Sequence, residues 1–242
     1  MLIEAHGLGR SFGATVAVAS VSFDVPAGQI VGILGPNGAG KSTTLRMLAG
    51  TLRPASGTAR IAGIDVGVHP EEARHRVGYL PEAANGFADL SVAEFLLVAA
   101  RGHGFARARG DAAVARVMRV LDLVLVASRP LSTLSKGWRQ RAWLGQALIH
   151  DPPVLLLDEP TDGLDPSQKE SMRRLLKSIA PERAILMSTH ILEEAEALCD
   201  RAIVIAQGRV VADSPIASLL DASGRLAPAV LRLTTSSAEA PA

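Results

Sequence analysis

The sequence predicts an α/β fold with a mainly parallel core sheet, an antiparallel β subdomain and a helical subdomain. An apolar, β-branched segment at 29–34 leads through a glycine-rich loop into a helix-like segment at 44–49. Strand-like and helix-like segments alternate from residue 154 to residue 206, which is typical of a parallel sheet covered on both faces. Between these regions, residues 91–149 carry apolar residues at helical spacing.

The composition fits a globular chain with a full core. Of the 242 residues, 48% are apolar and 20% are charged, which argues against disorder. The 25 basic and 24 acidic residues give a formal net charge of +1, so charge gives no reason to expect a nucleic-acid partner or an anionic membrane surface. The single cysteine, Cys199, excludes an internal disulfide and is expected in the core without a chemical role.

The sequence predicts neither secretion of this chain nor its insertion into a membrane. The N-terminus lacks the basic region and apolar stretch of a secretory signal. Long uncharged windows, such as 25–40, are interrupted by Pro, Gly and Asn and do not predict a transmembrane helix. We therefore expect a cytoplasmic chain, and if it acts on a membrane, another subunit spans the bilayer.

The first two thirds of the sequence predict the antiparallel layer and, after it, the helical subdomain. Strand-like segments separated by Gly, Pro and Ser turns occur at 2–6, 16–25 and 57–61, and a further one at 77–80. Helical periodicity, with Ser or Asp at plausible N-caps, occurs at 91–100, 111–126 and 137–149.

The last third predicts the rest of the parallel sheet and a C-terminal extension. Strands are expected at 154–157, 184–188 and 201–206, and helices at 166–179 and 191–198. A short helix at 216–221, a strand at 230–233 and a frayed tail at 236–242 are expected to follow. We expect one domain over 1–220, with its helical subdomain at about 85–150, and an extension over 221–242.

The loop after the first core strand has the pattern G-x-x-x-x-G-K-[ST]. Its residues are Gly35, Pro36, Asn37, Gly38, Ala39, Gly40, Lys41, Ser42 and Thr43. Glycines let backbone N–H groups point inward and the following helix adds the positive end of its dipole, so the loop is expected to bind a polyphosphate. Lys41 would reach the β- and γ-phosphates, and the Ser42 hydroxyl would be a ligand of the nucleotide's Mg²⁺. The alternative is a turn that only joins a strand to a helix.

Two acids end the apolar strand that begins at Val154. Asp158 and Glu159 follow three leucines, so they lie where the strand leaves the core and charge becomes tolerable. Asp158 would hold the metal, usually through a water, and Glu159 would be the general base or polarising group for a water attacking the γ-phosphate. Adjacent surface acids at a strand end are the alternative.

Residues 134–141 read Leu-Ser-Lys-Gly-Trp-Arg-Gln-Arg, and with them the chain resembles a known family. The phosphate loop, this segment, residues 155–159, the Thr-Asp-Gly-Leu-Asp at 161–165 and Thr189-His190 occur in the order found in ATP-binding subunits of ABC transporters. The resemblance extends from residue 1 to about 220. It implies a P-loop NTPase cassette with a RecA-like core sheet that hydrolyses ATP to power substrate movement by a separate polytopic membrane permease.

The resemblance also implies a head-to-tail dimer, expected to be a homodimer, around two Mg-ATP. The phosphate loop of one copy and residues 134–141 of the other, the family's signature segment, would hold each ATP. Ser135 and Gly137 of that segment would contact the nucleotide. A hydroxyl and bare backbone at a helix N-terminus form an anion site, so this assignment is physically reasonable. By itself the segment is more readily interpreted as an ordinary helix capped by Ser135.

Three further residues match family positions. Phe12 lies where the family places an aromatic that stacks on adenine, although a lone Phe beside a strand is equally a core residue. His190 matches the switch histidine that contacts the γ-phosphate. Asp165 resembles the residue that couples the two sites of the dimer, and it is also a good N-cap for a helix opening at Pro166.

The sequence departs from the family's usual pattern at two places. Lys136 and Trp138 replace Gly and Gln of the signature, and Glu82 replaces the usual Gln after the strand at 77–80. These patterns resemble an exporter-type subgroup of gliding-motility and CcmA-like cassettes. We expect Glu82 to ligate Mg²⁺ in the closed dimer; alternatively it stays in solvent, in a docking groove flanked by residues 83–89, and pairs with a basic residue of the membrane partner.

Two other functions fit the sequence less well. A soluble non-transport ABC ATPase acting on ribosomes or DNA usually carries two cassettes or a coiled-coil insertion, whereas this chain has one cassette, no heptads and no basic arm. A small-molecule kinase would leave the acids at 158 and 159 and the segment 134–141 unexplained. The cargo is not readable, because the resemblance assigns cargo handling to the membrane partner.

Overall fold

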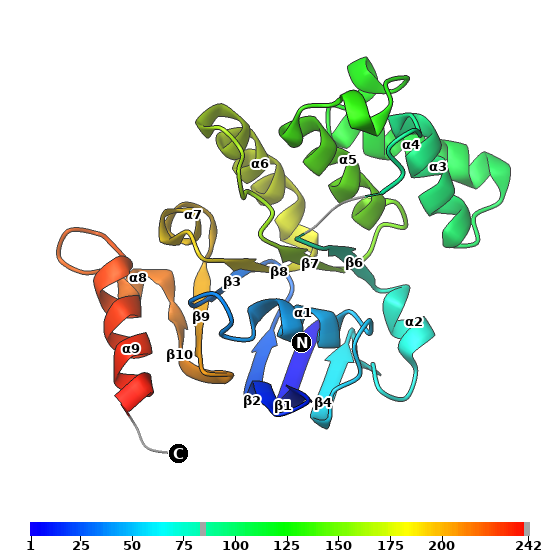
Figure 1. Cartoon of the computed structure of the whole chain (residues 1–242). Coiled ribbons are helices and arrows are strands. Elements are labelled where there is room, and N and C mark those ends of the chain that lie inside the picture. The colour runs from blue at the N-terminus through cyan, green and yellow to red at the C-terminus, as the bar shows by residue number, and fades with distance from the viewer. Residues whose placement is uncertain (83–85, 240–242) are drawn as a thin grey trace.

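The computed structural model describes residues 1–82 and 86–239, and over these residues ten strands form one curled mixed sheet (Figure 1). Their order across the sheet is β5-β4-β1-β2-β10-β9-β3-β8-β7-β6. The strands are β1 (Ile3–Phe12), β2 (Thr15–Val25), β3 (Ile30–Leu34), β4 (Ser56–Ile61), β5 (Ile64–Asp65), β6 (Val77–Leu80), β7 (Val154–Asp158), β8 (Ala184–Thr189), β9 (Arg201–Ala206) and β10 (Arg209–Pro215).

The helices lie on both faces and at the ends of this sheet. They are α1 (Lys41–Leu48), α2 (Pro70–Arg74), α3 (Val92–Gly102), α4 (Arg107–Val120), α5 (Lys136–Leu148), α6 (Pro166–Ile179), α7 (Leu192–Leu198), α8 (Ile216–Leu219) and α9 (Ala227–Glu239). Short 3₁₀ turns lie at Val124–Val126, Leu131–Thr133 and Ala180–Glu182. None of the helices in the described ranges has the length and apolar character that crossing a bilayer requires.

The parallel part of the sheet, β9-β3-β8-β7-β6, is its buried core. Every residue of β3, β7 and β8 is buried, as an apolar strand covered on both faces requires. Along β3, Val31 and Ile33 join the apolar cluster that contains α1, whereas Ile30 and Leu34 join the cluster on the opposite face. The predicted α/β fold with a mainly parallel core sheet is therefore confirmed.

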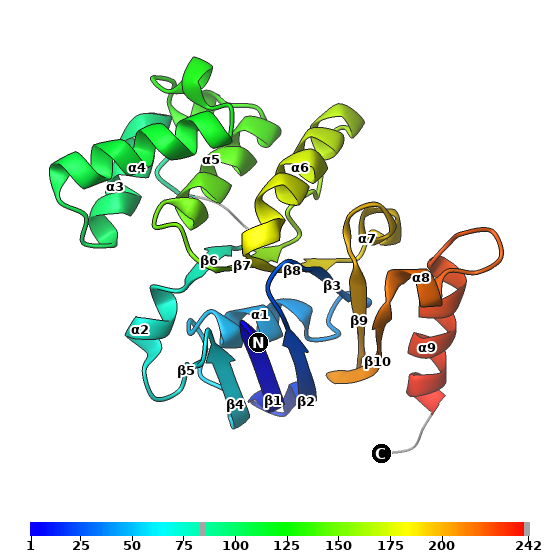
Figure 2. The same ribbon diagram turned by 180° about the vertical axis from the view of Figure 1, so that it is seen from behind.

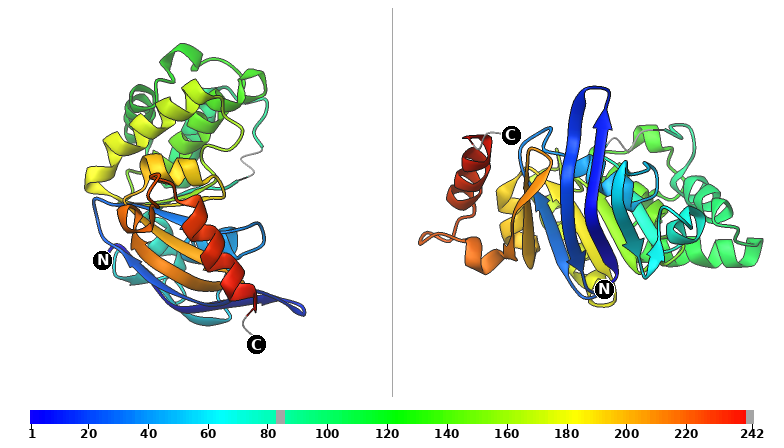
Figure 3. Two further views of the ribbon diagram at one scale, coloured as in Figure 1. Left: turned by 90° about the vertical axis from the view of Figure 1, so that its left-hand side faces the viewer. Right: turned by 90° about the horizontal axis from the view of Figure 1, so that it is seen from below.

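Helix α1 is enclosed by the curl of the sheet. It contacts β7 and β8 on one side and β1, β2 and β4 on the other, and Figure 3 shows these antiparallel strands as a separate layer. Leu45, Met47 and Leu48 are fully buried between the two layers. The antiparallel layer was predicted, although β1 extends to Phe12 instead of ending near residue 6.

Helices α3, α4 and α5 pack beside the β6 edge of the sheet, apart from the antiparallel layer (Figure 2). Ser91 caps α3 through a capping box with Glu94, so the predicted start of this helix is confirmed. At Gly145 a Cβ would lie 2.9 Å from Leu96 Cδ2, so glycine lets α5 approach α3 closely. The helix predicted at 111–126 instead runs from Arg107 to Val120, and a short 3₁₀ turn follows at Val124–Val126.

A buried ion network joins α6 to α7. The Glu194 carboxylate is 1% exposed and accepts hydrogen bonds from Arg173 at 3.1 and 2.9 Å, while Lys169 Nζ lies 3.2 Å away. Because a buried charge left without its partner costs about 3–5 kcal/mol, this network strongly favours one placement of α7. Helix α7 begins two residues after His190, so the network also supports that histidine.

The C-terminal region corrects the sequence-based expectation. The strand predicted at 230–233 is wrong, because this segment belongs to α9. Leu226, Ala229 and Val230 are buried at helical spacing against β9 and β10, whereas Leu231 is 68% exposed. The tail predicted from residue 236 is helical to Glu239, and residues 240–242 lie outside the described residues.

Candidate active site

The loop between β3 and α1 is shaped by close backbone contacts that only glycine allows. Gly35 has φ 151°, and a Cβ there would lie 2.1 Å from the Ile205 carbonyl oxygen. Gly40 has φ 106°, and a Cβ there would lie 2.6 Å from the Ala17 carbonyl oxygen. The loop is therefore packed closely against β9 and β2.

Lys41 opens α1 and is 6% exposed. Its Nζ donates to the carbonyl oxygens of Gly35 at 2.8 Å and Pro36 at 3.1 Å. Burial lowers the pKa of Lys41, while the carboxylates of Glu159, Asp158 and Glu82 oppose this change. A cation at the loop mouth whose two hydrogen-bond acceptors are neutral carbonyl oxygens is placed to gain from an incoming polyphosphate.

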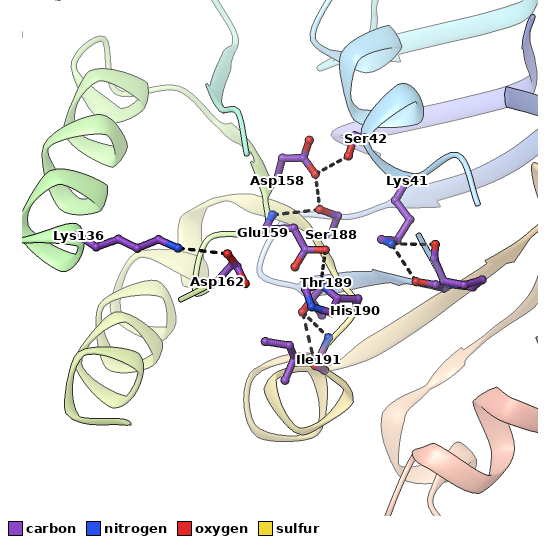
Figure 4. Close-up of polar contacts among 12 residues, drawn as sticks. Lys41, Ser42, Lys136, Asp158, Glu159, Asp162, Ser188, Thr189, His190 and Ile191 are labelled. Carbon is purple, nitrogen blue, oxygen red and sulfur yellow. Dashed lines mark hydrogen bonds and ion pairs between the residues drawn. The ribbon is translucent and has the colours of Figure 1, made fainter. Parts of the chain in front are cut away.

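Asp158 ends β7 with a carboxylate that two serines contact. Its Oδ1 accepts hydrogen bonds from Ser42 Oγ at 3.0 Å and Ser188 Oγ at 2.5 Å (Figure 4). Burial raises the pKa of Asp158, and the two hydroxyl hydrogen bonds act in the opposite direction. The parallel register brings Asp158 of β7 beside Ser188 of β8, which explains why residues distant in sequence meet here.

Glu159 leaves the strand in the left-handed region, with φ 50°. This conformation costs a non-glycine residue about 1–3 kcal/mol, so the surroundings must hold it. The Glu159 N–H donates to both Ser188 Oγ at 3.1 Å and Ser188 O at 3.3 Å. Its carboxylate Oε1 then lies 3.0 Å from His190 Nδ1, just beyond the end of β8.

These elements border a cleft of about 600 Å³. Its lining includes ten of the predicted site residues: Phe12, Asn37, Gly38, Gly40, Lys41, Ser42, Thr43, Glu82, Glu159 and His190. Phe12 is 44% exposed at the end of β1, with the Arg10 guanidinium 5.2 Å from its ring centroid. An exposed aromatic at one end and a lysine with acids at the other suit a ligand with a planar ring and a phosphate chain.

The signature residues lie elsewhere. Ser135 and Gly137 do not line this cleft; Gly137 borders a separate pocket with Trp138 and Gln168. Ser135 caps α5, its Oγ accepting from the Trp138 N–H at 3.5 Å. Figure 4 shows Lys136 on the opposite side of the acids from Lys41, with its Nζ 3.2 Å from Asp162 Oδ2.

Asp165 caps the next helix, as predicted. Its Oδ1 accepts from the Gln168 N–H at 2.9 Å and from Ser167 Oγ at 2.7 Å. Those hydrogen bonds lower the pKa of Asp165. Cys199 is buried in the core, and burial raises the pKa of its thiol to about 12, so the expectation of no chemical role is consistent with its surroundings.

A family model described as ABC transporter matches residues 18–162. This chain belongs to the ABC transporter family. It is the ATP-binding subunit type of that family, a cassette with ATPase activity.

Several curated relatives of this cassette are named Nod factor export ATP-binding protein I. The protein of Burkholderia lata is 41% identical over 220 residues, which are 90% of this chain and 72% of the relative. The protein of Mesorhizobium japonicum is 36% identical over 220 residues, which are 90% of this chain and 65% of the relative. The exporter-type resemblance seen in the sequence agrees with these names.

Solved structures show the same cassette fold. One described as the ATP-binding subunit of an ABC transporter has a TM-score of 0.84 and 30% identity, covering 97% of this chain and 100% of that chain. A bacterial ABC transporter cassette described as dimeric has a TM-score of 0.80 and 22% identity, covering 88% of this chain and 98% of that one.

Ser188 belongs to this site although the sequence did not predict it; Thr15, Val16, Ala17 and Asp162 of the cleft lining were not predicted as site residues either. Ser188 contacts both acids, yet in the sequence it is only a hydroxyl residue near the end of an apolar strand. Two buried hydroxyl residues at the end of β8, Ser188 and Thr189, are a signal in themselves, but the partners of Ser188 depend on strand register, which the sequence does not reveal.

Proposed function

We propose that this cassette binds Mg-ATP in the cleft, closes as a homodimer around two nucleotides and powers export by a separate polytopic membrane subunit. The observation that carries the dimer is the separation of Ser135 and Gly137 from the cleft that contains Lys41. A helix N-terminus that lies outside this cleft suits a phosphate brought by the nucleotide of another copy. The names of the Nod factor export relatives support export.

Each site residue has a proposed role in this reaction. Phe12 stacks on the base, the loop from Gly35 to Thr43 binds the phosphates, and Lys41 neutralises the β- and γ-phosphates. Glu159 activates water, and His190 contacts the γ-phosphate while hydrogen-bonding Glu159. The Glu159 backbone aims its carboxylate at the cleft because its N–H is held by Ser188.

The donor set fits Mg²⁺. Ser42 Oγ and the Asp158 carboxylate are hard oxygens that already meet at 3.0 Å, with Glu82 exposed on the border of the same cleft. When bound, Mg²⁺ supplies charge neutralisation across the β- and γ-phosphates. We assign Ser42 and Asp158 to the ion directly or through water, and Glu82 to it in the closed dimer.

The cassette has a groove beside Glu82 where the membrane partner could dock. A groove of about 500 Å³ is lined by aromatic and apolar side chains between the core and the helical subdomain, among them Tyr79, Pro81, Val98 and Trp143. Burial lowers the pKa of His150 in its wall to about 4, so this ring is neutral at pH 7. An apolar segment of the membrane subunit suits this surface. Residues 83–85 of the expected flank lie outside the described residues.

The groove assignment predicts that Val98→Asp prevents co-purification with a polytopic membrane protein. Val98 is 43% exposed, so the charge is tolerated in the free cassette but disfavoured under an apolar partner. Pull-down from detergent-solubilised membranes, with Val124→Asp as an exposed control outside the groove, measures this. Parent-like capture of the membrane protein by Val98→Asp, or capture of ribosomes in its place by the parent, would contradict the proposal.

A separate prediction concerns Glu82. If it ligates Mg²⁺, Glu82→Ala should raise the Mg²⁺ concentration for half-maximal ATP turnover by about tenfold, and Glu82→Gln should retain most activity because its carbonyl oxygen remains a ligand. Mg²⁺ titrations of the isolated cassette measure this, with the exposed Glu71→Ala as a control. Unchanged titrations, with transport lost only in the assembled complex, would favour a docking role.

We further propose that residues 1–220 act as the cassette and 221–242 as an extension. The helical subdomain, expected at about 85–150, would transmit dimer closure to the membrane subunit, because α3 and α5 border the groove. The cassette would then be cytoplasmic and peripheral on the inner face of the cell membrane, held there by its partner.

A further inference from the structure

Ser188 is the one hydroxyl that contacts both strand-end acids in the described part of the chain. It lies on β8, is fully buried, and its Oγ donates to Asp158 Oδ1 at 2.5 Å. The same oxygen accepts from the Glu159 N–H at 3.1 Å. A single side chain therefore ties the proposed metal-side carboxylate to the backbone of the proposed base.

The first of these contacts determines how Asp158 presents its oxygens. Oδ1 already accepts hydrogen bonds from Ser42 and Ser188, so the carboxylate plane is fixed from two sides. Ser42 alone could not fix it, because one hydrogen bond leaves the carboxylate free to rotate about χ2. Since Ser42 belongs to α1 and Ser188 to β8, the carboxylate is held between two elements that are rigidly packed.

The second contact acts on the backbone of Glu159. A left-handed φ of 50° persists at a non-glycine residue only where neighbours favour it. Ser188 supplies two acceptors to one N–H, its hydroxyl at 3.1 Å and its carbonyl at 3.3 Å. If the peptide relaxed to an extended conformation, the Glu159 side chain would leave the direction in which it meets His190 at 3.0 Å.

We propose that Ser188 is a positioning residue for ATP hydrolysis, which orients Asp158 toward the metal and Glu159 toward the attacked phosphate through one hydroxyl. This inference rests on the proposed function of the cleft. It assigns no bond making or proton transfer to Ser188 itself. Ser188 instead determines the positions of Asp158 and Glu159 when nucleotide and metal bind.

The test uses the full chain and the variants Ser188→Ala and Ser188→Thr. Loss of the hydroxyl should lower kcat by about 10- to 100-fold, the usual size of an effect from an outer-shell partner, with little change in the KM for ATP. Ser188→Thr, which keeps the hydroxyl and suits a strand, should restore most of kcat. Ser178→Ala removes an exposed hydroxyl of α6 and serves as the control.

A second readout separates positioning from loss of structure. Mn²⁺ affinity in the presence of a non-hydrolysable ATP analogue, followed by electron paramagnetic resonance of free Mn²⁺, should weaken in Ser188→Ala and recover in Ser188→Thr. The Tm of Ser188→Ala should fall by about 2–4 °C, as for one lost buried hydrogen bond. Parent-like kcat and Mn²⁺ affinity in Ser188→Ala, or loss in both variants alike, would overturn the proposal, as would a loss of kcat with unchanged Mn²⁺ affinity.

Glu159→Gln in the same series tells the two proposals apart. If Glu159→Gln hydrolyses ATP at the parent rate, the assignment of the cleft itself fails. If Glu159→Gln is inactive and Ser188→Ala behaves as the parent, only the role of Ser188 fails.

Discussion

Lys41→Ala is expected to abolish productive ATP binding and turnover by the isolated cassette. The ammonium is buried at the loop mouth and donates to two neutral carbonyl oxygens, so a bound polyphosphate would give it an anionic partner within the loop. Removing one member of a buried charge pair costs about 2–5 kcal/mol, which is roughly one and a half to three and a half orders of magnitude in affinity. The same loss applies to the transition state, where charge at the γ-phosphate is greatest.

The same variant should remain folded. Because burial lowers the pKa of Lys41, the folded state disfavours its charge relative to water, and deleting that charge removes a cost. Fluorescent-nucleotide titration, ATPase assays and thermal unfolding on one preparation measure all three quantities, with the exposed Lys177→Ala as the control. Near-parent ATP turnover by Lys41→Ala would contradict the role of the loop.

Much of the core could be predicted because its elements are locally unambiguous. Strand β6 and helix α6 begin and end at the predicted residues 77–80 and 166–179. The first lies between polar residues and a proline, and the second has an aspartate cap, a proline at its first position and strong amphipathic spacing. Where the capping residue, the apolar periodicity and the terminating residue agree, the bounds of an element depend little on tertiary contacts.

The C-terminal region was less predictable, since its structure depends on what it packs against. Strand β10 was not predicted, because most of its residues are only partly buried and it owes its conformation to antiparallel pairing with β9. Residues 230–233 read Val-Leu-Arg-Leu, and a short, mainly apolar segment of this kind does not by itself distinguish a strand from a helix. Burial of Leu226, Ala229 and Val230 on one side shows that a helical period applies.

Some features of the candidate site could likewise be predicted from the sequence, whereas others needed the structure. Motif spacing located the loop, the two acids and His190, because each lies at the end of a core strand where parallel strands bring side chains together. The left-handed backbone of Glu159 and the bridge through Ser188 arise from the register of β7 and β8. The contact of Lys136 with Asp162 joins residues from different elements and likewise needed the structure.

Glu159→Gln is expected to bind ATP and hydrolyse it very slowly. Glutamine keeps the size of the side chain and leaves the N–H contacts to Ser188 intact, so the local backbone should stay as it is. An amide cannot take a proton from water at neutral pH, and loss of a general base typically lowers the rate by about 10²- to 10⁴-fold. Single-turnover assays and nucleotide titrations separate the lost chemistry from binding, which should stay near the parent value.

The trapped ATP should also hold two copies of this variant together. With hydrolysis stopped, both phosphate sites stay filled, and Ser135 and Gly137 of each copy gain a nucleotide anion at their helix N-terminus. Size-exclusion chromatography with Mg-ATP should therefore show a dimer for Glu159→Gln and a monomer without nucleotide. Adding Ser135→Arg should disperse the dimer, because a long side chain would occupy the space through which the partner's γ-phosphate must approach. A Glu159→Gln protein that stays monomeric at high concentration with saturating Mg-ATP would contradict the head-to-tail arrangement for the isolated cassette, and a dimer unaffected by Ser135→Arg would place the interface elsewhere.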